Sequence, residues 1–289
     1  MFNWPLKFRQ QTAFCIPKGP LFKLSGQVSF SIGGTKISLR APRHSLSSHL
    51  EPISPYNIND FNDLRMRPWD QENANWRYQN FFRRQWVFYG PWFSGYKGNL
   101  TLDITLIAQS DDSDSPSYYR PKVFESIISD YLKLECADDI HEGAQEWIAP
   151  VNWREVSGCP CVAATFYTKP NDEVPSQHSP SRYFLFPVSD KHLMRVCFEL
   201  RRDSTGTQTE QDEKIGIAEI EQLSTDIMNS IHIELSPEAQ AQQEKALEGL
   251  EKVQLSKTFL PIKFTSPEQD AEYEQYLQDE LRTQELLKG

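Results

Sequence analysis

Residues 182–202 read RYFLFPVSDKHLMRVCFELRR, and this stretch decides the fold class. Two apolar runs flank the polar triplet Ser189 to Lys191, which predicts a turn between two strands. Both runs are apolar at consecutive positions, so both faces of each strand are expected to be buried. The hairpin is therefore predicted to lie at the centre of a sheet.

Further strands and helices are predicted on both sides of this hairpin. The segment CVAATFYTK (161–169) reads as a strand, and NLTLDITLIAQ (99–109) alternates apolar and polar residues as a half-buried strand does. Pro121 opens a helix, and residues 216–231 form a second one. The apolar positions at helical spacing are Phe124, Ile127, Ile128, Tyr131 and Leu132 in the first helix, and Ile217, Ile220, Leu223, Ile227 and Ile231 in the second.

Near the N-terminus, QVSFSIGGTKISLR (27–40) has the pattern of a β-hairpin. The Gly33-Gly34 pair supplies the positive φ angles of a two-residue turn. This turn would place Phe30 opposite Ile37 and Val28 opposite Leu39. No Gly-Lys-Ser/Thr follows the glycines, which argues against a phosphate-binding loop.

The C-terminal part predicts two polar helices, roughly 237–254 and 267–287. Each begins with Ser-Pro-Glu, in which Ser236 or Ser266 is the N-cap and proline takes the first helical position. Two other segments, PNDEVPSQHSPS (170–181) and DSTGTQTEQDEK (203–214), lack apolar periodicity, so we expect solvated loops there. DDIHEGAQEW (138–147) is likewise expected to be a solvated loop.

Together these elements predict an α+β protein with a largely antiparallel β-sheet flanked by helices and two polar C-terminal helices. We expect a basic, aromatic-rich region at 1–95, a sheet domain at 96–235 and an acidic helical appendage at 236–289. Over residues 97–235 the element order resembles the Mog1/PsbP-like fold. That resemblance implies a scaffold for protein contacts, with some relatives serving as bacterial secretion adaptors, and it assigns no site residues.

The segment WRYQNFFRRQWVFYGPWFSGY (76–96) holds ten aromatic residues. It is interleaved with arginines, so it allows three interpretations: sheet core, a protein-binding surface, or stacking on nucleic acid or glycan. The negative net charge and the strand-like alternation around Trp86 argue against nucleic acid. The candidate protein-binding residues are Trp76, Arg77, Arg83, Arg84, Trp86 and Trp92, together with Tyr273 and Tyr276 on the last helix.

Charge is divided unevenly along the chain. The net charge is −10, but residues 1–109 carry thirteen Lys and Arg against six Asp and Glu. The rest of the chain is therefore strongly acidic. One part of the protein could then present a surface of a single charge sign to a partner. The five scattered cysteines are typical of reduced thiols in a cytoplasm. No apolar run approaches the ~20 residues that a membrane helix needs, so we expect no membrane association.

No catalytic, metal or cofactor motif stands out. Cys159 and Cys161 lack the two-residue spacer of zinc and thioredoxin motifs, and neither GxSxG nor HExxH occurs. We therefore expect a cytoplasmic protein without cofactor or metal that binds another protein, for example as an immunity protein or adaptor for a bacterial effector. The alternatives are a hydrolase-type enzyme with a site that lacks a recognisable motif, and a nucleic-acid or glycan binder.

Overall fold

The computed structural model of the chain describes residues 14–44, 50, 55–58, 76–91, 94–109, 116–174 and 178–288. The strands in these ranges are β1 (Gly26–Ile32), β2 (Thr35–Ala41), β3 (Trp76–Tyr89), β4 (Tyr96–Gln109), β5 (Ile140–His141), β6 (Ala144–Gln145), β7 (Trp147–Glu155), β8 (Ala164–Pro170), β9 (Ser181–Ser189), β10 (His192–Arg202) and β11 (His232–Glu234). The helices are a 3-10 turn η1 (Phe22–Leu24), α1 (Pro121–Cys136), α2 (Gln208–Lys214), α3 (Ala218–Asn229), α4 (Pro237–Leu247) and α5 (Pro267–Lys288).

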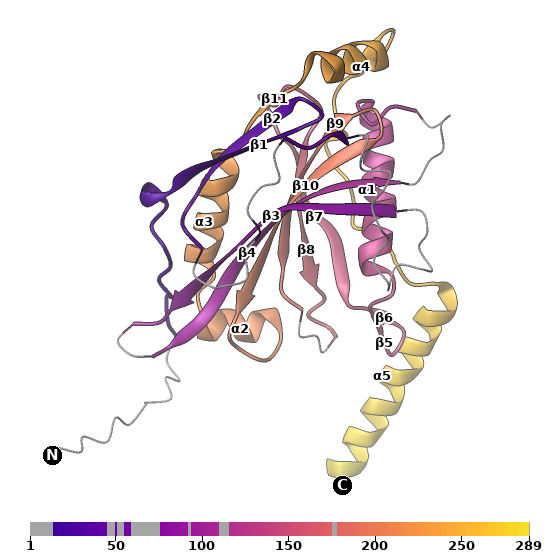
Figure 1. Cartoon of the computed structure of the whole chain (residues 1–289). Helices are drawn as coiled ribbons and strands as arrows, with labels where there is room; N and C mark the ends of the chain where they lie inside the picture. The colour runs from indigo at the N-terminus through magenta and orange to yellow at the C-terminus, as the bar shows by residue number, and fades with distance from the viewer. Residues whose placement is uncertain are drawn as a thin grey trace, which may run out of the picture.

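A six-stranded antiparallel sheet forms the centre of the molecule (Figure 1). Its strand order is β3-β4-β10-β9-β8-β7, so the hairpin of β9 and β10 occupies the two middle positions. This confirms the prediction from residues 182–202. Leu185 and Phe186 are adjacent in sequence, point to opposite faces and are both fully buried, as a central strand requires.

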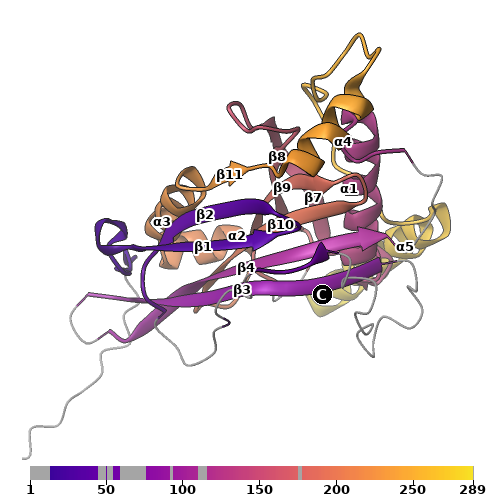
Figure 2. The same cartoon turned by 45° about the horizontal axis from the view of Figure 1, so that its top comes forward.

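One face of this sheet is covered by a second, three-stranded sheet of β1, β2 and β11, together with α3 (Figure 2). The register of the predicted hairpin is confirmed, because Val28 pairs with Leu39 and Phe30 with Ile37. Gly33 and Gly34 have φ angles of 53° and 81°, which only glycine adopts without strain. The first hydrophobic core lies between the two sheets.

The opposite face is covered by α1 and by the chain that follows α4. Phe124, Ile128 and Leu132 of α1 are fully buried against β7, β8 and β9. These residues form a second hydrophobic core between the sheet and α1. Leu255 is buried in it, and Phe259 packs edge-on against Trp153 at 4.9 Å. Residues 255–264 therefore complete a core of the sheet.

Two local predictions were wrong. Residues 203–214 were expected to be a loop, but they contain α2, which begins with a capping box between Thr207 and Glu210. The box satisfies the free N–H groups of the first turn, so a short polar helix forms without an apolar stripe. The helix expected at 237–254 ends at Leu247, because Gly249 adopts a φ of 72°.

The fold class itself is confirmed: the protein is α+β, with large antiparallel sheets flanked by helices. Figure 1 shows α5 running away from the sheets, with the C-terminus at its far end. In the part of the chain that the structure describes, no helix has the length and apolar character needed to cross a membrane.

Candidate functional site

The aromatic-arginine segment is mostly strand β3 and is built into the protein. Trp86 is fully buried in the first core, and Trp76 is buried in the second. The indole N–H of Trp86 donates to the carbonyl oxygens of Pro42 at 3.2 Å and Arg43 at 3.0 Å. Both indoles are thus enclosed by this chain and offer no face to a partner. Trp92 lies outside the described residues.

The arginines of the same segment serve the fold as well. Arg84 donates to the carbonyl oxygen of Pro42 at 2.9 Å, and its guanidinium lies 5.0 Å from the centre of the Phe82 ring. The Arg83 Nε lies 3.6 Å from a carboxylate oxygen of Asp103 on the neighbouring strand β4. Arg77 is half-buried on β3. Arg84 is thus held by the chain itself, whereas Arg83 remains exposed beside its ion pair.

Helix α5 carries the other two candidates, Tyr273 and Tyr276. Their rings stack on each other at 6.3 Å, and both are half-buried. Leu277 is 39% exposed and Leu281 is 61% exposed. With Tyr273, these leucines follow an i, i+4, i+8 spacing, which places them along one side of the helix. We call Tyr273, Tyr276, Leu277 and Leu281 the α5 stripe.

Among the side chains that the structure describes, the contacts that hold α5 to the body lie just before the helix and in its first two turns. Gly143, between β5 and β6, has a φ of 85° and approaches the backbone of Gln269 so closely that a Cβ would collide with it. The Tyr273 hydroxyl donates to the carbonyl oxygen of Glu173 at 3.4 Å. Gln145 accepts from the backbone N–H of Phe264 at 3.0 Å, just before the helix. The start of α5 is thus fixed in place.

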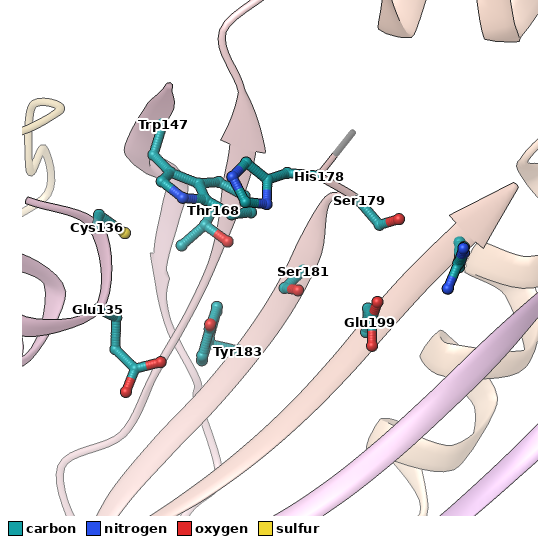
Figure 3. Close-up of a pocket in the computed structure, with 10 residues that line it drawn as sticks. Glu135, Cys136, Trp147, Thr168, His178, Ser179, Ser181, Tyr183 and Glu199 are labelled. Atoms are coloured by element: carbon teal, nitrogen blue, oxygen red, sulfur yellow. The ribbon is translucent and has the colours of Figure 1, made fainter. Parts of the chain in front are cut away.

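A polar cleft of about 320 Å³ opens beside this attachment point (Figure 3). Its floor is formed by Tyr183 and Ser181 of β9 and Thr168 of β8, and Figure 3 shows Trp147 and His178 on one side of it. Glu135, the residue before the last of α1, and Glu199 of β10 stand on other sides. The cleft lies on the face of the sheet that α1 covers.

His178 is held in the cleft wall by three contacts. Its ring stacks on the indole of Trp147 at 4.5 Å. Its Nε2 lies 2.9 Å from a carboxylate oxygen of Glu146 and 3.7 Å from one of Asp139. Asp139 in turn accepts from the Trp147 indole N–H at 2.7 Å. Asp139 and Glu146 flank the short hairpin of β5 and β6, so the segment expected to be a solvated loop supplies this wall.

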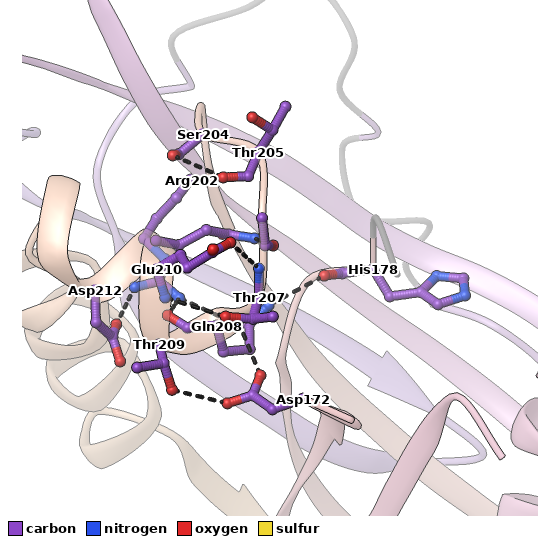
Figure 4. A network of polar contacts seen from close by, with 12 residues as sticks. Asp172, His178, Arg202, Ser204, Thr205, Thr207, Gln208, Thr209, Glu210 and Asp212 are labelled. Atoms are coloured by element: carbon purple, nitrogen blue, oxygen red, sulfur yellow. Dashed lines mark hydrogen bonds and ion pairs between the residues drawn. The ribbon is translucent and has the colours of Figure 1, made fainter. Parts of the chain in front are cut away.

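A polar network joins Asp172 and the backbone of His178 to the start of α2 (Figure 4). Asp172 accepts from the backbone N–H of Gln208 at 2.8 Å and from the Thr209 hydroxyl at 3.0 Å, which caps the first turn of α2. The Gln208 amide donates to the carbonyl oxygen of His178 at 3.4 Å. The guanidinium of Arg202, almost wholly buried, joins Gln208 to Asp212. Helix α2 therefore positions the outer wall of the cleft.

The cleft is lined by a thiol that is not activated, and a buried arginine lies close to one of its carboxylates. Burial raises the pKa of the Cys136 thiol to about 12, so it stays protonated at neutral pH and is a poor nucleophile. The Arg195 side chain of β10 lies between the sheet and α1, donates to the Tyr131 hydroxyl at 2.5 Å and is 3.9 Å from Glu135. Across the described residues, no group of three or more His, Cys, Asp and Glu side chains is placed to hold a metal ion.

The cleft residues were missed by sequence reasoning. His178 lies 32 positions from Glu146 and more than 20 from Glu199, so no local spacing joins them. Only the strand order brings them together. No family model, no curated protein and no solved structure matches this chain.

Proposed function

We propose that this chain is a non-catalytic protein-binding protein and that the α5 stripe is the surface that meets its partner. An immunity protein or adaptor for a bacterial effector would work in this way. The observation that carries the proposal is α5 itself: a 22-residue helix attached at its first turns whose stripe keeps Leu277 and Leu281 exposed.

The composition of α5 indicates what kind of partner fits. Residues 267–288 hold seven acidic and two basic residues. An amphipathic helix binds by laying its apolar side into a groove, and complementary charge speeds and selects the encounter. The expected partner thus has an apolar groove with a basic rim.

The location that goes with this proposal is the cytoplasm. All five cysteines are free, and Cys15, Cys136 and Cys161 are buried. Free thiols suit a reducing compartment.

Co-purification from the native host with and without α5 tests the proposal. The chain should end after Thr265, because cutting after Leu235 would remove Ala239, Ala246 and Leu255 from the two cores. We expect the shortened chain to keep its thermal unfolding temperature within a few degrees and to lose a stoichiometric partner that the full chain retains. A folded, shortened chain that still holds the same partner would refute α5 as the binding element.

A hydrolase-type activity is the second candidate, and the pairing of His178 with Glu146 in a cleft is the observation that favours it. A carboxylate that orients a histidine is a recurrent part of acid–base catalysis. A hydrolytic activity in a substrate screen that His178→Ala abolishes would favour this candidate over the first.

A further inference from the structure

The cleft of Figure 3 contains polar groups that this chain leaves unused. Thr168 is 2% exposed and Ser181 is 9% exposed, and both line the cavity. Among the described residues, neither side-chain hydroxyl has a hydrogen-bond partner. Both side chains line the open cavity, so their hydroxyls are free to bind water or the polar group of a ligand.

The charges around the cavity select a cation. Within the described part of the chain, Glu199 forms no ion pair, and Glu135 has only the 3.9 Å approach of Arg195. Glu135 also lies at the C-terminal end of α1, where the helix dipole favours positive charge. Of the two basic residues at the cleft, His178 is engaged by Glu146, and Arg201 is exposed on the strand.

We propose that this cleft binds a guanidinium group. Carboxylates and hydroxyls approach the cavity from several sides, and a guanidinium carries five N–H donors in a planar fork that can reach several acceptors at once. An ammonium offers only three donors from a single point. A cavity of about 320 Å³ is at the small end of ligand sites, which suits one side chain and not a larger molecule.

The source of the guanidinium is an arginine side chain of the partner, and this part rests on the proposed function. Gly143, which touches the first turn of α5, lies in the hairpin between Asp139 and Glu146 of the cleft wall. Glu173, which accepts from Tyr273, precedes the His178 loop. A basic protein seated on α5 would therefore have the cleft within reach.

N-acetyl-arginine amide is the probe for the cleft itself. We expect its titration to shift the NMR signal of the Trp147 indole N–H, assigned with Trp147→Phe. Glu199→Gln and Glu135→Gln should each weaken binding by about tenfold or more, since each removes a charge-assisted contact. Glu244→Gln, a matched change on the exposed side of α4, should leave binding unchanged. The citrulline analogue, which has the same shape without the charge, should not bind.

Three results would overturn the inference: no shift with the arginine probe, equal binding of the citrulline analogue, or unchanged binding in both cleft variants. If N-acetyl-lysine amide bound more tightly than the arginine probe, the cleft would be a site for an ammonium group and the guanidinium proposal would be wrong. The probe experiment needs no partner protein. A negative result would therefore contradict guanidinium binding by the cleft without bearing on partner binding by α5. With the native partner, a loss of affinity in Glu199→Gln supports a partner arginine, whereas an unchanged affinity contradicts it and leaves a free guanidino compound as the ligand.

Discussion

Trp86 shows how one residue joins three parts of the fold. Its ring is buried between the two sheets, and its N–H reaches the chain that leaves β2. A large aromatic side chain contributes more buried area than any aliphatic one, and a buried N–H needs a partner. Both conditions are met here, and Trp76, Phe81, Phe82 and Phe88 are also buried, so packing explains these aromatic residues of β3.

Replacing Trp86 with Ala should destabilise the protein by about 3–5 kcal/mol, because it leaves a cavity in the first core. Trp86→Phe keeps most of the packing and loses the two hydrogen bonds, so a smaller cost of about 1–2 kcal/mol is expected. Urea unfolding followed by circular dichroism measures both. A soluble Trp86→Ala variant with unchanged stability would mean that this indole is not part of the core.

The roles of single residues were predictable only where a local pattern determines them. Phe30 and Ile37 pair as expected, because a two-residue turn sets the register of a hairpin. Whether Trp86 was core or surface depended on what covers β3, and the covering sheet comes from elsewhere in the chain. The same holds for His178, whose partners are distant in sequence.

At the scale of elements, the region after α3 divides into two parts with different attachments. Helix α4 and residues 255–264 are fixed to the sheet, while the contacts of α5 with the body, among the side chains that the structure describes, lie at its start. Glu125 of α1 is one of the anchors. It is buried and accepts hydrogen bonds from the backbone N–H and the hydroxyl of Ser256, and from Lys122 at 2.9 Å.

This anchor predicts a pH-dependent stability. Burial opposes ionisation of Glu125, but the hydrogen bonds from Ser256 and Lys122 outweigh it and lower the pKa of the carboxyl below its ordinary value. A lowered pKa in the folded state stabilises the protein above the unfolded pKa, and the stabilisation is lost as the pH falls through the folded value. Glu125→Gln should therefore be less stable than the natural protein at pH 7.

The difference in unfolding free energy between the two proteins should shrink below about pH 4, where the carboxyl of the natural protein is increasingly protonated. Denaturant unfolding at several pH values checks this. Glu244→Gln on α4 is the control and should show no such trend. A constant difference from pH 7 to pH 3 would contradict the role given to the Glu125 charge.

Element starts were predicted better than element ends. Ser236 caps α4 by accepting from Ala239 N–H at 3.1 Å, and Pro267 begins α5, both as the Ser-Pro-Glu signals indicate. Helix α4 ends before Gly249, which has a positive φ angle. The sequence did not predict this end, because the apolar residues beyond Gly249 continue the helical spacing. The start of helix α2 carries the Thr-x-x-Glu pattern of a capping box. The helix was not predicted, because its sequence lacks apolar residues at helical spacing.

At the scale of the whole molecule, the basic and acidic parts of the sequence share one sheet. Strands β3 and β4 belong to the basic part, and β4 pairs with β10 of the acidic part. Exposed ion pairs such as Lys18 with Glu219 and Lys36 with Glu234 connect the two parts, although such pairs contribute little stability. Neither of these two pairs involves α5, whose acidic residues are assigned to partner recognition only by the proposed function.

The affinity of the native partner for variants of the α5 stripe decides whether this helix holds the partner. Leu277→Ser with Leu281→Ser removes two apolar anchors, each worth about 1–2 kcal/mol at an interface. We expect binding to weaken by about 30-fold or more in calorimetric titration, with an unchanged melting temperature. Leu260→Ser, at a leucine that is 78% exposed on the body, is the matched control and should bind as the natural protein does. If the double variant bound the partner as tightly as the natural chain, the partner would not be held by α5.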